Sequence, residues 1–207
     1  GNLHSAEKAF QRMARETGAG AVIVSARPED VARADRIVLP GDGAFPACKR
    51  ALDGAGGLAE AIREAVEEKG RPFLGICVGM QLMARAGHEY ETVPGFGWID
   101  GEVVRIAPET APGERALKVP HMGWNDLVVA AGDHPVLAGI GTGQHAYFVH
   151  SYHMEVTGPG QLLATAEYGG PVTAIVGRDN MVGTQFHPEK SQGPGLRLIA
   201  NFLRWAP

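Results

Sequence analysis

An apolar run that passes straight into a glycine-flanked cysteine constrains the fold of this chain more than any other feature. The run covers residues 71–76, and Gly75 and Gly79 stand two positions before and after Cys77. Where a strand turns sharply into a helix, the backbone is crowded at these two positions, and a residue without a Cβ fits best. The pattern predicts a strand, a tight turn and a helix, with Cys77 as a reactive thiol thrust clear of the sheet.

A helix near the N-terminus is indicated by apolar side chains at helical spacing. These are Ala6, Ala9, Phe10 and Met13. Asn2 or Ser5 would cap the start of this helix, and Gly18 and Gly20 would end it.

The rest of the first half alternates between strand and helix patterns. Strands are expected at residues 21–24, 36–39 and 71–76, and a helix at residues 58–69. This alternation favours βαβ units and therefore a parallel sheet covered by helices.

The second half changes to short apolar runs separated by Gly, Pro and Asp turns, which is typical of antiparallel or mixed strands. Such runs occupy residues 99–106, 127–130, 146–152, 162–166, 172–176 and 181–186. A closing helix is expected over residues 195–205, with its buried side formed by Leu196, Ile199, Leu203 and Phe202. We therefore expect an α/β protein with a central, mostly parallel sheet flanked by helices, an added antiparallel or mixed β part, and one domain over residues 1–207.

Composition excludes several classes of function. With 44% hydrophobic residues the chain can bury a substantial core, and its net charge of −4 gives no basic excess for binding nucleic acid or an anionic membrane. The two cysteines, Cys48 and Cys77, show no metal-ligand spacing, so neither a disulfide scaffold nor a zinc site is expected. The chain has no membrane-length apolar run and no charged leader, so we expect a soluble, cytoplasmic protein. We also expect it to use no cofactor.

A cysteine nucleophile needs a base and a group that orients the base, and the sequence GTQFHPEKSQ supplies both. His187 and Glu189 are two residues apart, which places them on the same side of an extended chain. Pro188 favours that conformation because the residue before a proline is disfavoured in a helix. The motif predicts a carboxylate beside the imidazole.

A third motif, residues 40–43 (PGDG), ends a strand in a turn that can present backbone N–H groups to an oxyanion. One such donor, together with the N–H of Val78, would form a hole for a tetrahedral intermediate. A plain proline–glycine loop is the alternative. The motif matches neither a Walker nor a dinucleotide-binding fingerprint.

In the order PGDG, GICVG and HPE, these motifs resemble those of the class I (triad) glutamine amidotransferases. The flavodoxin-like fold of that family is implied. GICVGMQLM, PHMGWN, YFVHSYH and QFHPEKSQ narrow the resemblance to the glutaminase subunits of imidazole glycerol phosphate synthases of histidine biosynthesis, and GNLHS and GFGWIDGEVVRI fit the same pattern. The resemblance covers essentially the whole chain.

The resemblance implies a site residue by residue. The triad would be Cys77, His187 and Glu189; the oxyanion turn would be Gly41 and Asp42 beside Val78; and L-glutamine would contact Gln81, Glu89 and the backbone of Ser151 and Tyr152. Glu89 is preferred over Glu91 because of its spacing to Gly95 and Gly97. Asp42 departs from the small or apolar residue expected in that turn.

The resemblance also implies a partner, a (β/α)8 barrel cyclase subunit that receives ammonia. Trp124 and Asn125 in HMGWN are the main candidates for the interface, followed by Asn2 and Tyr147. Family members normally begin with a short strand and a glycine-rich turn before GN, so a further strand is expected upstream of residue 1.

Three alternatives remain open at this point. The chain could serve another synthase, such as that of anthranilate or guanylate, although PHMGWN and the short tail after Trp205 disfavour this. It could be a hydrolase or chaperone of the related elbow-cysteine families, although Glu189 opposes that role. It could also be an inactive subunit kept for assembly, if the oxyanion turn never adopts a working conformation.

Overall fold

The computed structural model describes residues 3–207, so the predicted interface residue Asn2 lies outside the described part. The helices are α1 (Leu3–Thr17), α2 (Pro28–Arg33), α3 (Phe45–Asp53), α4 (Leu58–Arg63), α5 (Val78–Gln81) and α6 (Gln192–Arg204), with short turns η1 (Glu64–Glu68), η2 (Pro135–Leu137) and η3 (Pro188–Lys190). The strands are β1 (Ile37–Gly41), β2 (Phe73–Cys77), β3 (Ala84–Glu89), β4 (Glu91–Pro94), β5 (Ile99–Arg105), β6 (His121–Asp126), β7 (Val128–Val129), β8 (His145–His150), β9 (Tyr152–Val156), β10 (Leu162–Glu167), β11 (Pro171–Arg178) and β12 (Met181–Thr184).

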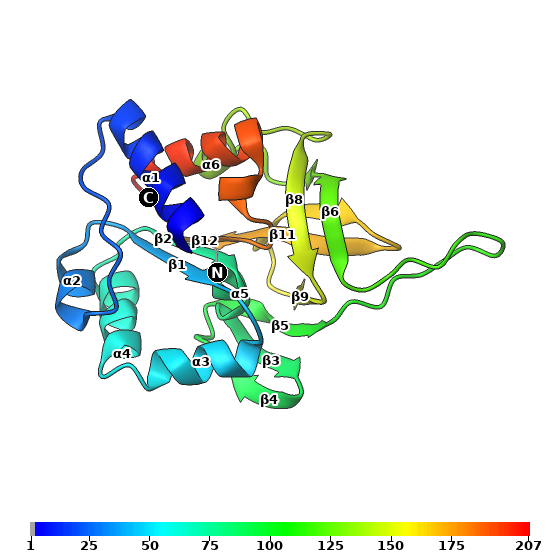
Figure 1. Cartoon of the computed structure of the whole chain (residues 1–207), viewed down its shortest axis with the longest axis horizontal. Helices are drawn as coiled ribbons and strands as arrows, with labels where there is room; N and C mark the ends of the chain where they lie inside the picture. The colour runs from blue at the N-terminus through cyan, green and yellow to red at the C-terminus, as the bar shows by residue number, and fades with distance from the viewer. Residues whose placement is uncertain (1–2) are drawn as a thin grey trace.

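A six-stranded sheet in the order β1-β2-β12-β11-β10-β7 forms the centre of the molecule (Figure 1). The pairs β1–β2 and β2–β12 are parallel, and β11, β10 and β7 continue the same sheet with antiparallel pairing. The α/β class is confirmed, and the antiparallel strands expected in the C-terminal half extend the parallel portion. β2 is buried along its whole length, as expected of a central strand covered on both faces.

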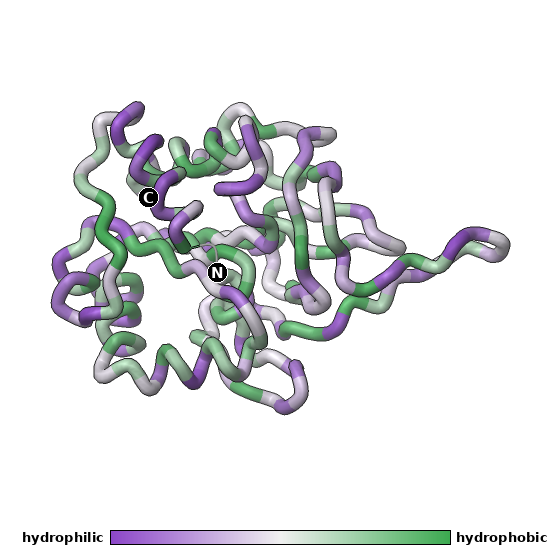
Figure 2. Tube along the Cα trace, viewed as in Figure 1, coloured by the Kyte–Doolittle hydropathy of each residue, from purple (hydrophilic) through white to green (hydrophobic). Residues whose placement is uncertain are grey.

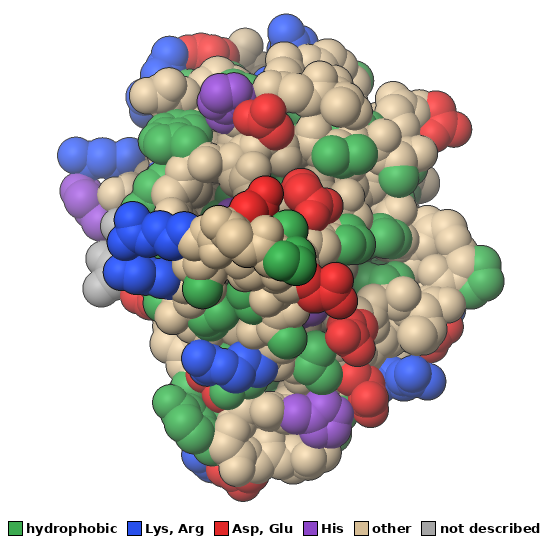
Figure 3. All heavy atoms as spheres, turned by 90° about the vertical axis from the view of Figure 1, so that its right-hand side faces the viewer, with side chains coloured by type: hydrophobic (Ala, Val, Ile, Leu, Met, Phe, Trp, Pro, Cys, Tyr) green, Lys and Arg blue, Asp and Glu red, His purple; other side chains and the backbone are tan. Residues whose placement is uncertain are grey.

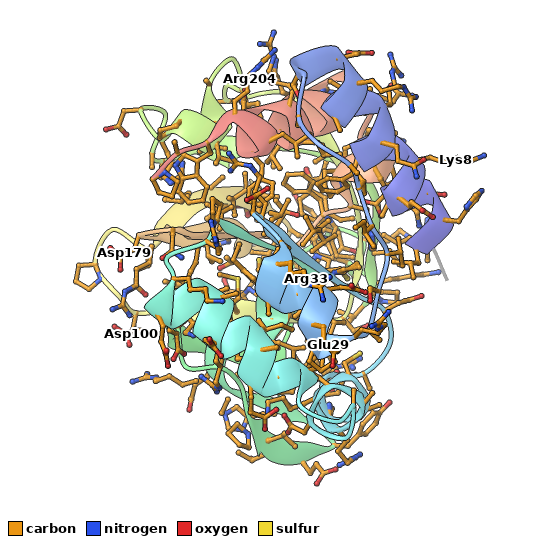
Figure 4. All side chains as sticks on the ribbon, turned by 90° about the vertical axis from the view of Figure 1, so that its left-hand side faces the viewer. Lys8, Glu29, Arg33, Asp100, Asp179 and Arg204 are labelled. Atoms are coloured by element: carbon orange, nitrogen blue, oxygen red, sulfur yellow. The ribbon has the colours of Figure 1, made fainter. Side chains whose placement is uncertain are left out.

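Helices cover both faces of this sheet. α1 packs beside α6 on one face, and α3 and α4 lie on the other (Figure 1). The apolar side of α1 is the predicted one, since Ala6, Ala9, Phe10 and Met13 are buried. Its polar side faces solvent: Figure 4 shows Lys8 of α1 projecting outward, away from the sheet. The amphipathic pattern therefore placed this helix correctly.

Two smaller sheets complete the fold. One has the order β4-β3-β5-β9, and the other is the antiparallel pair of β6 and β8, which lies at the right of Figure 1. The long connection from β5 to β6 extends away from the body on the same side (Figure 1). The chain passes from β8 to β9 at Ser151, where the run predicted as one strand over residues 146–152 is broken.

The strand predicted at residues 21–24 is wrong. This segment has no regular secondary structure, and Ile23 is 72% exposed. It is the apolar stretch on the outer left of the tube in Figure 2. β-Branched residues favour a strand, but a strand also needs a hydrogen-bonded neighbour, and within residues 3–207 this segment has none. Propensity was overridden by the lack of a pairing partner.

Other boundaries also differ from expectation. Because α1 begins at Leu3, Ser5 lies inside the first turn and is not the cap. The helix after Cys77 ends at Gln81, where the chain turns into β3.

Strands β3, β4, β6 and β9 were not predicted. The closing helix starts at Gln192, before the predicted position, and Leu196 and Leu203 pack only partly against the core, whereas Ile199 and Phe202 are buried as predicted.

Candidate active site

The turn at Cys77 lies against the end of the neighbouring strand. β1 pairs with β2 so that Gly41 is opposite Cys77. A Cβ on Gly79 would stand 1.8 Å from the carbonyl oxygen of Leu39, and a Cβ on Gly75 would stand 2.6 Å from the carbonyl oxygen of Gly79. Both glycines are therefore required by close backbone approach, as the sequence predicted. Cys77 itself adopts φ 55° and ψ −115°, the strained conformation of a nucleophile elbow.

The structure brings His187 to Cys77 from the next parallel strand, because β12 pairs with β2 and His187 follows β12. Nδ1 of His187 lies 2.9 Å from Oε1 of Glu189, and the His187 side chain faces the same crevice as Cys77, whose sulfur helps to raise the pKa of His187. The side chains of His187 and Glu189 are 9% and 2% exposed. The sulfur, the imidazole and the carboxylate therefore form one buried array, in the order that the motifs predicted.

The charge state of His187 follows from its two partners. Burial acts to lower the pKa of His187, but the hydrogen bonds and charges of Cys77 and Glu189 act in the other direction and raise it from 6.5 to about 9. An imidazolium beside the sulfur is therefore the stable state at neutral pH. The carboxylate oxygen Oε2 of Glu189 is buried without a hydrogen-bond partner, so the His187 imidazole is the principal group that compensates this charge.

A crevice of about 300 Å³ opens above the array. It is lined by Asp42, Gly43, Cys77, Val78, Gln81, Glu89, Pro120, Val149, His150, Ser151, Tyr152 and His187. The predicted glutamine contacts and the oxyanion turn thus face the same space as Cys77. Asp42 is exposed, and its carbonyl accepts a hydrogen bond from the thiol of Cys48 at 3.2 Å. This contact restrains the turn.

The polar floor of the crevice contains a residue that sequence reasoning missed. Gln185 is fully buried, its Oε1 accepts a hydrogen bond from Nε2 of Gln81 at 3.0 Å, and its Nε2 points to Sγ of Cys77 at 3.7 Å. The signal in the sequence is a long polar side chain in the strand-like run MVGTQF, where it follows Thr184 and precedes Phe186. Such a residue is rarely buried without a partner.

The other predicted contacts are already engaged within the chain. Gln81 Nε2 also donates to the carbonyl of Tyr152 at 3.1 Å, and the carbonyl of Ser151 accepts from the N–H of Ile106. Glu89 lines the crevice while its Oε2 accepts from the backbone N–H of Phe45, the first residue of α3. A carboxylate at a helix start is favourably placed, which fixes its position at the rim.

Two of the predicted interface residues meet on the outer sheet. Trp124 of β6 is paired with Tyr147 of β8, and their rings lie edge to face at 5.8 Å. Trp124 is 48% exposed. Asn125 is different, because its side chain hydrogen-bonds to His121 Nε2, to the carbonyl of Glu167 and to the N–H of Asp126. Its amide is therefore engaged by groups of the chain itself, and its place in an interface stays a prediction.

A second, open hollow of about 430 Å³ lies beside this pair of aromatic rings, lined by Trp124, Gln144, His145, Ser191, Gln192 and Pro194. The face at the right of Figure 1, which is turned toward the viewer in Figure 3, carries acidic and apolar side chains side by side. Ser191 joins this hollow to the active site, since its Oγ donates to the carbonyl of His187 at 2.6 Å and accepts from the N–H of Tyr147 at 3.0 Å.

Residues 3–207 form neither a metal-binding cluster nor a membrane-spanning helix. No group of three or more His, Cys, Asp or Glu side chains is arranged to hold a metal ion in this part of the chain. None of its helices combines the length and the apolar character that crossing a membrane requires.

The geometry agrees with comparisons to known proteins. Residues 2–205 match the family described as glutamine amidotransferase class-I. The chain belongs to this family. Two relatives carry the name imidazole glycerol phosphate synthase subunit HisH: one from Cereibacter sphaeroides, 72% identical, and one from Ruegeria pomeroyi, 70% identical. Each match covers 100% of this chain and 95% of the relative. The chain is therefore an amidotransferase of the HisH group.

Solved structures of lower identity share the fold. A crystal structure of a glutamine amidotransferase is 22% identical with a TM-score of 0.68, and the match covers 96% of this chain and 94% of the other. The glutaminase domain of Trypanosoma brucei CTPS, solved with bound acivicin, is 15% identical with a TM-score of 0.63 over 100% of this chain and 89% of that domain. The class I amidotransferase fold is confirmed.

Proposed function

We propose that this chain hydrolyses L-glutamine to glutamate and ammonia through a thioester on Cys77, and delivers the ammonia to a cyclase subunit. The single observation that carries the proposal is the buried array of Cys77, His187 and Glu189 beneath a crevice that also contains Gln81 and Glu89. The names of the 72% and 70% identical relatives support the assignment to imidazole glycerol phosphate synthase and histidine biosynthesis.

The first half-reaction forms the thioester. The sulfur of Cys77 attacks the carboxamide carbon of glutamine, and the imidazolium of His187 protonates the departing ammonia. The raised pKa of His187, about 9, supplies this acid at neutral pH. Glu189 orients the ring through Nδ1, which leaves Nε2 for the sulfur and the leaving group.

The second half-reaction releases glutamate. His187, now neutral, accepts a proton from water as the water attacks the thioester, and the sulfur leaves as a thiolate. In both steps negative charge develops on the carbonyl oxygen. The N–H of Val78 and one N–H of the turn at Gly41 and Asp42 are the proposed donors, since both elements line the crevice or adjoin it at Cys77.

Ammonia released into neutral water would be protonated and would lose its nucleophilicity, so the product needs a protected path to its acceptor. We propose a (β/α)8 barrel cyclase as the partner, docked on the face formed by Trp124, Tyr147 and the adjoining hollow. A half-exposed tryptophan beside polar groups is typical of interface anchors. Catalysis also needs a free thiol, so we propose a reducing compartment, the cytoplasm, as its location.

A glutaminase assay on four mixtures tests the proposal: the chain alone, with the cyclase, with the nucleotide ligand of the cyclase, and with both. We expect slow glutamate release from the chain alone and a strong rise when both are added. Equal rates in all four mixtures would remove the coupling to the cyclase while leaving the triad intact. No glutamate in any mixture, with no labelling of Cys77 by a glutamine-like electrophile, would favour an inactive subunit.

Service to another synthase remains the second candidate within the family. A rise in glutamate release on addition of the cyclase separates the two candidates. If this chain served an anthranilate or guanylate synthase instead, adding the cyclase would cause no such rise. Cys77→Ala is the control for labelling in each case.

A further inference from the structure

Two buried histidines that the proposed mechanism does not use lie in direct contact at the wall of the crevice, which His150 lines. His121 of β6 and His150 of β8 are opposite each other in the strand register, and they are only 3% and 6% exposed. Nδ1 of His121 lies 2.9 Å from Nε2 of His150. The ring of His121 is packed against Phe148 at 4.7 Å and Tyr168 at 4.3 Å.

The outer partners of the pair fix every proton in it. Nδ1 of His150 lies 2.8 Å from the carbonyl oxygen of Tyr152, which can only accept, so this nitrogen carries the hydrogen. Nε2 of His150 is then an acceptor, and Nδ1 of His121 must donate to it. Nε2 of His121 in turn accepts from the amide of Asn125 at 3.1 Å, whose second hydrogen goes to the carbonyl of Glu167. Both rings are neutral Nδ1–H tautomers, and the bonds from Asn125 to His121, from His121 to His150 and from His150 to Tyr152 all run in one direction, toward the crevice.

This ordered chain ends at the groups beneath Cys77. The carbonyl of Tyr152 accepts one hydrogen bond from His150 and a second from Gln81, which uses both of its lone pairs. Gln81 continues to Gln185, and Gln185 to the sulfur of Cys77. The position of the Gln81 carboxamide is therefore set from one side by Gln185 and from the other by a carbonyl that His150 holds.

We propose that His121 and His150 are positioning residues for the glutamine site: their one-way hydrogen-bond chain fixes the carbonyl of Tyr152 and, through it, the carboxamide of Gln81. The inference deepens the proposed function, on which it rests. It assigns no chemical step to either histidine. It predicts that a hydrogen-bond donor at position 121 determines the binding of glutamine.

The chain works only while both rings are neutral. A proton on Nε2 of His150 would face the N–H of His121, so two donors would meet. The surroundings oppose protonation: burial lowers the pKa of His121 to about 4 and that of His150 to about 3. The ionisable groups that face His150 are His121, His153 and His187, each of which opposes a further positive charge, and the hydroxyl of Tyr168, beside His121, is bonded to the carbonyl of Lys118.

Two variants in the complex with the cyclase separate positioning from packing. His121→Phe keeps the ring between Phe148 and Tyr168 but has no donor for His150. His121→Asn loses the ring but places an amide N–H near the position of Nδ1. We expect His121→Phe to raise the KM for glutamine about tenfold or more, as expected for a lost buried hydrogen bond, with kcat changed by less than about threefold. His121→Asn should keep KM within about threefold of the wild type.

If the role of His121 is purely structural, the variant with the lower melting temperature should have the higher KM. If His121 positions Gln81, the variant without a hydrogen-bond donor, His121→Phe, should have the higher KM even if it is the more stable of the two. A wild-type KM in His121→Phe, or an Asn variant as impaired as the Phe variant, would overturn the inference.

A second measurement does not depend on glutaminase activity. In the ¹⁵N-histidine-labelled chain, the imidazole signals of His121 and His150 should both report the Nδ1–H tautomer and should not titrate between about pH 8 and 5.5, given the lowered pKa values of both rings. An Nε2–H tautomer or a titration in that range would contradict the inference even in an active enzyme. If the tautomers are as expected and the wild type never hydrolyses glutamine, the proposed function fails instead.

Discussion

Nδ1 of His187 is held 2.9 Å from Oε1 of Glu189, and the only other oxygen of that carboxylate is buried without a partner. The carboxylate therefore acts on the imidazole alone, and its negative charge helps to raise the pKa of His187 to about 9 against the opposing effect of burial.

Replacing this carboxylate with an amide should disable the acid. In Glu189→Gln we expect the pKa of His187 to fall and kcat for glutamine hydrolysis to drop about 10²–10⁴-fold, the usual contribution of general acid–base catalysis. Steady-state kinetics and an NMR titration of His187 measure the two effects. The matched control is Glu155→Gln, an exposed carboxylate on β9, which should change neither. An unchanged pKa of His187 in Glu189→Gln would contradict this account of the pair.

The two roles of the array should separate at high pH. Above about pH 9, His187 loses the proton that ammonia needs on departure, so kcat should fall. Alkylation of Cys77 by iodoacetamide needs only the thiolate and should continue at the same or a higher rate. Parallel pH profiles of turnover and alkylation test this. A common decline of both above pH 9 would show that the pH effect acts on the sulfur or on the fold.

The same shift predicts how stability depends on pH. The pKa of His187 is higher in the folded state than its ordinary value of 6.5, so the folded state is stabilised by proton binding. This contribution is fully present below about pH 6.5 and is lost as pH rises through about 9. In Cys77→Ala the raised pKa should fall, because the sulfur is the largest of the groups that raise it. Urea unfolding of wild type and variant at pH 6 and pH 9.5 should therefore show the larger pH-dependent loss in the wild type.

The elbow glycine should tolerate no side chain. In Gly79→Ala the new methyl would overlap the carbonyl of Leu39, so we expect a loss of about 3 kcal/mol or more in the free energy of unfolding, the upper range for overpacking. Gly141→Ala is the control, because its Cβ would meet nothing within 4 Å. Urea denaturation gives the free energy of unfolding of both variants. Equal values would mean that β1 can move away from the turn at little cost.

The exposed tryptophan should matter for the partner and little for the fold. In Trp124→Ala we expect the Kd for the cyclase to rise about 30-fold or more, which corresponds to a hot-spot loss of about 2 kcal/mol, while the melting temperature changes little. Ile23→Ala, an exposed apolar residue between α1 and α2, is the control and should bind as the wild type does. Calorimetric titration of the cyclase into each variant gives the comparison. An unchanged Kd for Trp124→Ala would move the interface elsewhere.

The sequence predicted those parts of the molecule that depend on local chemistry. The two glycines around Cys77 follow from steric crowding at one turn, and the contact of His187 with Glu189 follows from two residues on one side of an extended chain. The apolar side of α1 follows from helical spacing. Each of these needs only residues that are neighbours in the sequence, which is why a motif reveals them.

Features that depend on distant partners were missed. Nothing around residues 21–24 shows that the segment lacks a neighbouring strand, so its β-branched residues were misleading. Gln185 and the pair of His121 and His150 become meaningful only when β6, β8 and β12 are brought together. The placement of Asn125 at an interface stays a prediction, and the intrachain bonds of its amide become visible only in the folded chain.

The order of the strands has a consequence for biosynthesis. β12 inserts directly beside β2, although more than a hundred residues separate the two strands in the sequence, so the imidazole reaches the sulfur only after the segment through His187 has left the ribosome. A nascent chain that has not yet reached residue 187 carries Cys77 without its proposed base. The topology thereby delays the pairing of sulfur and base until β12 has joined the sheet.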